Sequence, residues 1–186
     1  PLENFGKYVK MGADFQCIAA KYMGAPHSTG FALGTEEVIE AISRHSFVGY
    51  EARRIRGIGR PQKIDRQEMI GGLTAVQQWF SINHEERLAL AEKQSRTILD
   101  NLGGIPGVQV HLIDNIIGHQ PFGVHLEINP LVTGKNVHQI VDELKQGDPP
   151  IWTRVRNGEN HILIHMFGLH LGEEEIVSKR LIQLLS

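Results

Sequence analysis

One lysine stands where covalent chemistry on a carbonyl group is feasible. Lys21 follows the apolar run from Phe15 to Ala19 and precedes the small residues Gly24-Ala25-Pro26. The apolar run predicts a buried strand, and a glycine beside it lets a ligand approach the backbone closely. An amine at the end of such a strand can attack a carbonyl carbon once it has lost its proton. The alternative is a surface lysine in a turn, since lysines are common in loops.

The residues after this lysine could bind an anion. His27, Ser28 and Thr29 lie between Pro26 and Gly30. Hydroxyl groups and backbone amides in a concave loop suit a phosphate or a carboxylate, and the imidazole of His27 could contact a phosphate or a substrate. The alternative is an ordinary structural turn.

Positive charge gathers in residues 47–66, which we call the arginine loop because the segment has no helical or strand periodicity. Guanidinium groups bind carboxylates or phosphates through paired hydrogen bonds, so we expect four arginines to bind a small anionic substrate. RNA binding is a second reading, disfavoured because Tyr50 alone interleaves with the arginines and the net charge is −2. Surface ion pairs are a third. The four arginines are Arg53, Arg54, Arg56 and Arg60.

The ten histidines do not predict a metal site. His161 and His165 are four residues apart on a predicted strand and so share one of its faces. No cysteine, carboxylate or third histidine stands at a partner spacing that the sequence can fix. We therefore expect no bound metal.

Composition indicates an ordinary globular protein without a membrane partner. Hydrophobic residues make up 41% of the chain and charged residues 22%, with a single cysteine and no apolar run of 18 residues. One cysteine cannot form an internal disulfide framework, and its use fits a reducing cytoplasm. We expect a cytoplasmic location.

Helical patterns dominate the first part of the chain. A helix is predicted from about Leu2 to Lys10, and a second starts after Thr35, whose hydroxyl can cap it. From Asp65 the periodicity stays helical, with a break and a fresh cap at Asn83, until the glycine-rich run 103–107 ends it.

The remainder predicts an α+β unit. Asn157-Gly158 between two alternating runs is a strong hairpin signal. We expect two helices on one face of a short, largely antiparallel sheet. The strands are predicted at 108–113, 123–128, 151–156 and 161–165, and the helices at 135–145 and 173–185.

The lysine segment resembles a known family. The stretch from Lys21 to Gly30 (KYMGAPHSTG) with the following FALG, the stretch 49–61 and the helix start at Asp65 are similar to fold-type-I pyridoxal-phosphate (PLP) enzymes. The likeness is to the group of selenocysteine synthase (L-seryl-tRNA selenium transferase) and glucosaminate-phosphate ammonia-lyase. The resemblance implies an α/β fold, the carboxyl-terminal part of a fold-type-I PLP-dependent transferase. Residues 1–64 would end the large domain, 65–104 would form connecting helices, and 105–186 a small α+β domain.

The resemblance also implies a function. Lys21 would carry pyridoxal 5'-phosphate as an internal aldimine, with His27, Ser28 and Thr29 at the cofactor's phosphate. The expected reaction is lyase or transferase chemistry on an amino acid or amino sugar acid, a small anionic substrate. In such enzymes a small-domain arginine often binds the substrate carboxylate, and Arg154 and Arg156 alternate on a predicted strand.

Two further expectations concern partners. The chain reads as one that begins inside a domain, so we expect it as a homo-oligomer or beside a missing amino-terminal half, with weak cofactor binding by itself. The alternative function is a non-catalytic dimerisation or RNA-binding module derived from the same fold. The segment Ile18-Ala19-Ala20, shorter by about one residue than in the group, favours that alternative.

Overall fold

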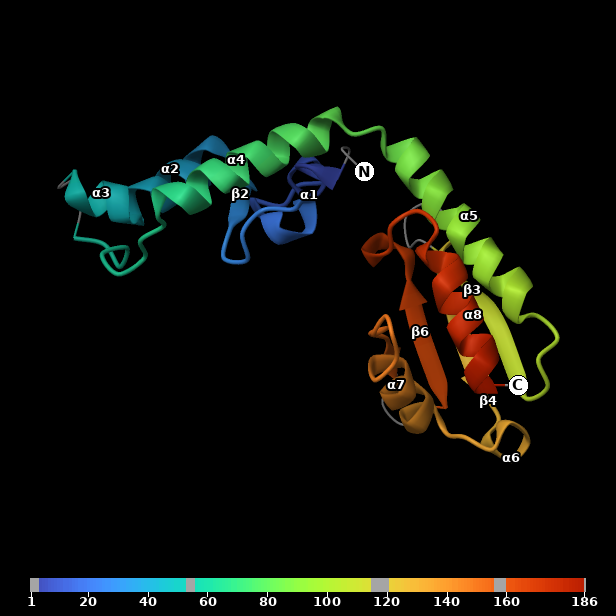
Figure 1. The fold of residues 1–186 in the computed structure, drawn as a ribbon. Helices are drawn as coiled ribbons and strands as arrows, with labels where there is room; N and C mark the ends of the chain where they lie inside the picture. The colour runs from blue at the N-terminus through green and yellow to red at the C-terminus, as the bar shows by residue number, and fades with distance from the viewer. Residues whose placement is uncertain (1–3, 53–55, 115–120, 156–159, 186) are drawn as a thin grey trace. The chain divides into compact units, whose positions relative to one another are not determined.

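The chain divides into two compact units, Pro1–Ile82 and Asn83–Ser186. The structure, a computed structural model, describes residues 4–52, 56–114, 121–155 and 160–185 (Figure 1). The division falls between two helices that the sequence places in one helical stretch.

The first unit is built on a β-hairpin. Strands β1 (Phe15–Ala19) and β2 (Gly30–Gly34) pair antiparallel, and the 3-10 helix η2 (Ala20–Met23) starts the connection between them. The strand predicted over Phe15–Ala19 is confirmed. The prediction that β1 is buried is wrong, because exposed and half-buried residues alternate along this strand and Cys17 is exposed. A two-stranded sheet leaves much of its surface uncovered.

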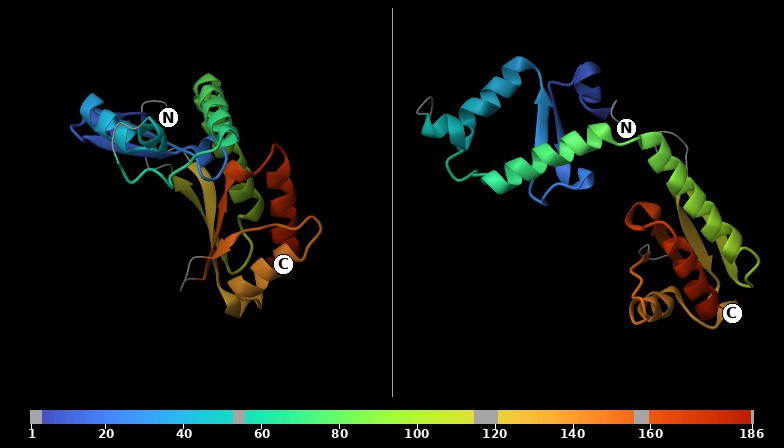
Figure 2. Two further views of the ribbon diagram at one scale, coloured as in Figure 1. Left: turned by 90° about the vertical axis from the view of Figure 1, so that its left-hand side faces the viewer. Right: turned by 45° about the horizontal axis from the view of Figure 1, so that its top comes forward.

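Four helices accompany this hairpin, and α4 lies beside it (Figure 2). Helix α4 begins directly after Asp65, where the helix start was predicted, and Asp65 Oδ1 accepts the Glu68 amide at 2.8 Å. Thr35 stands at the N-cap of α2 without a side-chain capping bond, so its predicted role is wrong. A short helix also occupies the start of the arginine loop, where none was predicted. The helices are α1 (Lys7–Lys10), α2 (Glu36–His45), α3 (Phe47–Glu51) and α4 (Arg66–Ser81).

The second unit contains one four-stranded sheet in the order β3-β4-β6-β5, and every pairing among the described strands is antiparallel. The predicted strand at 151–156 is shorter than expected, because the Ile151 amide bonds to the Leu144 carbonyl at 2.9 Å and the segment leaves the sheet. The Asn157-Gly158 turn and Arg156 lie outside the described residues. The strands are β3 (Val108–Asp114), β4 (Pro121–Ile128), β5 (Arg154–Val155) and β6 (His161–His165).

The helices of this unit follow the predicted pattern. Asn83 caps α5 through its Oδ1, which accepts the amides of Glu85 and Glu86 at 3.1 and 3.3 Å, so the predicted break and cap are confirmed. A short helix precedes α7, and a 3-10 helix follows β6. The elements are α5 (His84–Leu102), α6 (Pro130–Thr133), α7 (Val137–Lys145), η3 (Met166–Gly168) and α8 (Glu173–Leu185).

The core of the second unit lies between one face of the sheet and three helices. The core residues of β4 and β6 stand at every second position of each strand, as expected for a sheet with one covered face. Helices α5, α7 and α8 supply the opposing layer (Figure 1). Fully or nearly fully buried members include Ile98, Val124, Leu126, Ile140, Leu144, Ile162 and Leu181.

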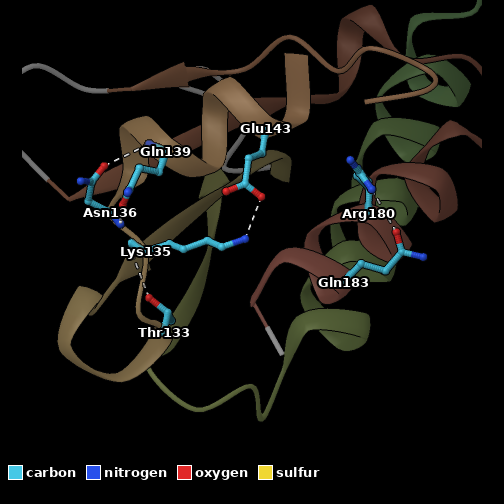
Figure 3. A network of polar contacts seen from close by, with 7 residues as sticks. All are labelled: Thr133, Lys135, Asn136, Gln139, Glu143, Arg180 and Gln183. Atoms are coloured by element: carbon cyan, nitrogen blue, oxygen red, sulfur yellow. Dashed lines mark hydrogen bonds and ion pairs between the residues drawn. The ribbon is translucent and has the colours of Figure 1, made fainter. Parts of the chain in front are cut away.

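Polar contacts fix the start of α7 (Figure 3). Asn136 and Gln139 form a reciprocal capping box, with side-chain to backbone distances of 3.0 and 2.9 Å. Lys135 Nζ donates to Glu143 Oε2 at 2.7 Å, and the Thr133 hydroxyl donates to the Lys135 carbonyl at 3.0 Å. These bonds satisfy groups that a helix start leaves unpaired, so the short connection from α6 is well defined.

A buried glutamate ties α8 to α5. Glu174, which is 7% exposed, accepts hydrogen bonds from Gln94 Nε2 and from the Gly172 amide, both at 2.9 Å. Gln94 also donates to the His170 carbonyl at 3.1 Å. Burial opposes ionisation, but the bonds from Gln94 and the backbone, with the charge of Lys93, outweigh it and lower the pKa of Glu174.

This glutamate should make stability depend on pH. A folded-state pKa below the unfolded value of about 4.3 adds stability above that pH, and the addition is lost as pH falls through the folded pKa. We expect Glu174→Gln to cost about 1–2 kcal/mol of unfolding free energy at pH 7 and much less near pH 3. Urea unfolding at both pH values measures this. The exposed Glu86→Gln is the control, and an equal loss for Glu174→Gln at both pH values would contradict the prediction.

Candidate functional site

Lys21 lies in η2, directly after β1, with its side chain exposed. The preceding Ala20 is fully buried, and its amide donates to the Thr29 carbonyl at 3.0 Å. Lys21 Nζ lies 5.1 Å from the centroid of the Tyr22 ring. The backbone at this lysine is therefore fixed by the hairpin while the amine stays accessible.

The turn after Lys21, which reverses the chain between β1 and β2, contains a glycine and a proline. Gly24 closes η2 with a φ of 89°, a value that favours glycine. The hydroxyl of the buried Thr29 donates to the Pro26 carbonyl at 2.6 Å, so its proton is used within the loop. His27 and Ser28 are exposed. Of the three predicted anion-binding residues, these two have side chains that a ligand can reach.

Helix α4 packs directly against this turn. A Cβ added at Gly71 would lie 2.8 Å from Cδ of Pro26, and one at Gly72 would contact Thr29 at 3.8 Å. Glycine at position 71 therefore permits the close approach. The helix that opens at Asp65 thus supports the loop that follows Lys21.

An apolar pocket of about 330 Å³ adjoins the lysine turn. It includes Ala19 and Tyr22, the residues on either side of Ala20-Lys21. Sequence reasoning did not find it, because its walls come from segments far apart along the chain. The lining also includes Phe5, Gln16, Cys17, Met23 and Trp79.

Aromatic rings hold the described part of the arginine loop. The guanidinium carbon of Arg60 lies 5.8 Å from the Phe47 ring centroid and 5.7 Å from that of Tyr50, and its Nε is 3.9 Å from Glu51 Oε1. Gly59 allows this docking, since a Cβ there would lie 2.1 Å from the His45 carbonyl oxygen. The side chain of Arg60 is therefore already in contact with other residues of the loop.

Of the other three arginines that were predicted to bind substrate, the structure describes Arg56. Arg56 is exposed. Arg53 and Arg54 lie outside the described residues. Arg60 lies within cation–π distance of two aromatic rings of the loop.

The second unit has its own pocket, of about 350 Å³, where the segment 151–153 separates from β6. Arg154 and His165 bring polar groups to it, and burial together with the charge of Arg154 lowers the pKa of His165. The Thr153 hydroxyl is buried without a hydrogen-bond partner among the described residues. The lining is Ile151, Trp152, Thr153, Arg154, Leu163, Ile164, His165, Gly168, Leu169 and Val177.

Strand pairing gathers three histidines on the sheet face away from the core. His111 is directly opposite His125, and His125 Nε2 lies 2.5 Å from His161 Nδ1. The register between β4 and β6, and not the spacing along one strand, brings His125 to His161, so the sequence alone does not predict this contact. Within the described ranges no group of three histidine, cysteine or acidic side chains is arranged to hold a metal ion.

No described helix is long and apolar enough to cross a membrane.

The chain has the fold of the carboxyl-terminal part of fold-type-I PLP-dependent enzymes. The solved structure of D-glucosaminate-6-phosphate ammonia-lyase matches with a TM-score of 0.66 and 19% identity, over 96% of this chain and 45% of that one. The predicted fold class is confirmed.

One more solved structure and one curated sequence resemble this chain. A C-DES variant with glycine covalently linked to its PLP cofactor matches with a TM-score of 0.57 and 15% identity, over 94% of this chain and 47% of that one. A 5'-C-glycyluridine monooxygenase-decarboxylase from Streptomyces sp. is 26% identical over 171 residues, 91% of this chain. The chain spans 38% of that curated relative's length. No protein family model matches the sequence.

Proposed function

We propose that the natural protein containing these residues is a PLP-dependent enzyme in which Lys21 holds the cofactor. The observation that carries the proposal is the position of Lys21, an accessible amine on a fixed turn at the end of β1. The sequence likeness to a curated enzyme over 91% of the chain, and the fold shared with a protein whose PLP carries a covalent glycine, support it.

The described residues fit such a group. The turn after Lys21 is formed by small residues, and Ser28 and His27 stand exposed beside it, so both could contact a phosphate. The cofactor, when bound, supplies an electron sink for a carbanion. Lys21 Nζ would then take up and return a proton at the substrate carbon.

We assign the substrate to the amino acids or amino sugar acids. The arginine loop, with exposed Arg56, would attract an anionic group in the first unit. Arg154, at the pocket of the second unit, is a separate candidate for pairing with a carboxylate. The names of the relatives, an ammonia-lyase and a monooxygenase-decarboxylase, favour lyase chemistry; transferase chemistry uses the same groups.

Reductive trapping tests the proposal. The natural protein is incubated with pyridoxal phosphate, reduced with borohydride and digested, and the modified lysine is identified by mass spectrometry. We expect the pyridoxyl group on Lys21 and none on Lys10, an equally exposed lysine of the same unit. Labelling spread evenly over exposed lysines, or concentrated on another lysine, would overturn the assignment.

A further inference from the structure

The sheet of the second unit carries four histidines on the face turned away from its helices, which we call the histidine face. The opposite face is the core, where alternate residues of β4 and β6 meet α5, α7 and α8 (Figure 1). Residues directly opposite one another on antiparallel strands share a face, so the register fixes the members of this one. Its ionisable members are His111 on β3, His125 and Glu127 on β4, His161 and His165 on β6, and Arg154 on β5.

Two of these histidines are in direct contact between β4 and β6. His125 Nε2 lies 2.5 Å from His161 Nδ1, and both side chains are half-buried. The N–H of one imidazole can donate only to a ring nitrogen that carries no hydrogen, so this contact requires at least one neutral ring. When both rings are protonated, every ring nitrogen carries a hydrogen and the contact is lost.

Further basic groups stand around this pair. His111 faces His125 from β3, with ring centroids 6.1 Å apart. Arg154 on β5 supplies a charge that is present at all ordinary pH values. Burial, and then the charge of Arg154, lower the pKa of His165. Each proton that the face takes up therefore meets other positive groups.

Carboxylates on the described strands offset little of this charge. Glu127 is directly opposite His161 and is exposed, so solvent screens its interactions. Asp114 ends β3, where the register with β4 shifts. Imidazole groups begin to take up protons near their ordinary pKa of about 6.5. Below that pH the face gains more positive charge than one exposed carboxylate can balance.

We propose that the histidine face makes the second unit sensitive to mild acid. At neutral pH the contact between His125 and His161 joins β4 to β6. Protonation breaks this contact and places like charges on neighbouring strands, whereas the histidines of an unfolded chain take up protons freely. The stability is therefore complete above about pH 6.5 and is lost as the pH falls below that value. Glu174 acts in a separate range, below about pH 4.3.

Hydrogen exchange of the natural protein tests the proposal, because it reports on β4 and β6 themselves. Peptides covering these strands are analysed by mass spectrometry at pH 7.5 and 5.5, with correction for the intrinsic exchange rate. Each extra proton bound on opening raises the opening constant about tenfold per pH unit, so wild-type protection should fall at least about tenfold. His125→Gln and His161→Gln remove the titrating rings and should each show a clearly smaller fall.

A matched control separates this effect from a general loss of stability. His138→Gln removes an exposed histidine of α7, outside the sheet, and should keep the wild-type dependence on pH. A variant that only loses packing would lower protection equally at both pH values and leave the wild-type fall unchanged. That result for His125→Gln and His161→Gln would overturn the inference, as would equal protection of the wild-type strands at pH 7.5 and 5.5.

Discussion

Replacing Lys21 with alanine is expected to lower kcat/KM of the natural protein by about a thousandfold. Proton transfer by a positioned side chain contributes roughly 10²–10⁴-fold, and here the same amine would also hold the cofactor. The fold should not suffer, because the lysine side chain is exposed and its amine lies over the ring of Tyr22, the next residue. Steady-state kinetics of the natural protein with an amino acid or amino sugar acid that it turns over, and with the cofactor in excess, measures the loss.

Two variants make this result specific. Lys10→Ala removes an equally exposed lysine of the first unit and should leave kcat/KM within twofold of wild type. Lys21→Arg keeps the positive charge but stays protonated, so it should be as inactive as the alanine variant. If Lys21→Ala kept a tenth or more of wild-type kcat/KM, Lys21 would not be the residue that holds the cofactor.

The secondary structure around Lys21 was largely predictable, because its signals are local. The run from Phe15 to Ala19 gives β1 with the bounds expected, α4 starts after Asp65 as predicted, and Asn83 caps α5 as predicted. Caps act through the amides of the next turn, which the adjacent sequence determines. Burial of β1 was not predictable, since it depends on what covers the hairpin.

The pockets could not be predicted, because they depend on how distant segments meet. The pocket of the second unit exists because the segment 151–153 bonds to the end of α7 and leaves β6. The contact of His125 with His161 depends on the register of β4 against β6, which a hydrophobic pattern alone does not fix for every residue pair. Residue type alone made Arg154 and Arg56 candidates for binding an anion, and the structure then showed how each of them is surrounded.

The arginine loop shows how a local rule can mislead. Glycine and proline in 47–66 favoured an irregular segment, yet Phe47–Glu51 is helical and the Ser46 hydroxyl caps it by accepting the Gly49 amide at 3.2 Å. The rings of that helix then receive the Arg60 guanidinium group. An arginine held by aromatic rings is less free to contact either an RNA backbone or a small anion, so Arg60 does not decide between the two readings of the loop.

The second unit should depend strongly on Leu126. This side chain is fully buried at the centre of β4, where its strand neighbours in the sheet are Val110 and Ile162. Its removal takes away apolar burial and leaves a cavity between the sheet and the helices that cover it. We expect Leu126→Ala to lower the unfolding free energy of the natural protein by about 2–5 kcal/mol.

Leu131→Ala is the matched control for this change, because Leu131 on α6 is 94% exposed and the same atoms are removed. Surface substitutions of this kind usually stay within about 0.5 kcal/mol of wild type. Chemical unfolding of both variants, followed by circular dichroism, measures the two free energies. Since Leu126 lies on the core face of the sheet and Arg154 lines the pocket, Leu126→Ala should lower stability without removing any group assigned to the substrate. Equal stabilities of the two variants would mean that β4 is not packed against α5 and α8 as the structure has it.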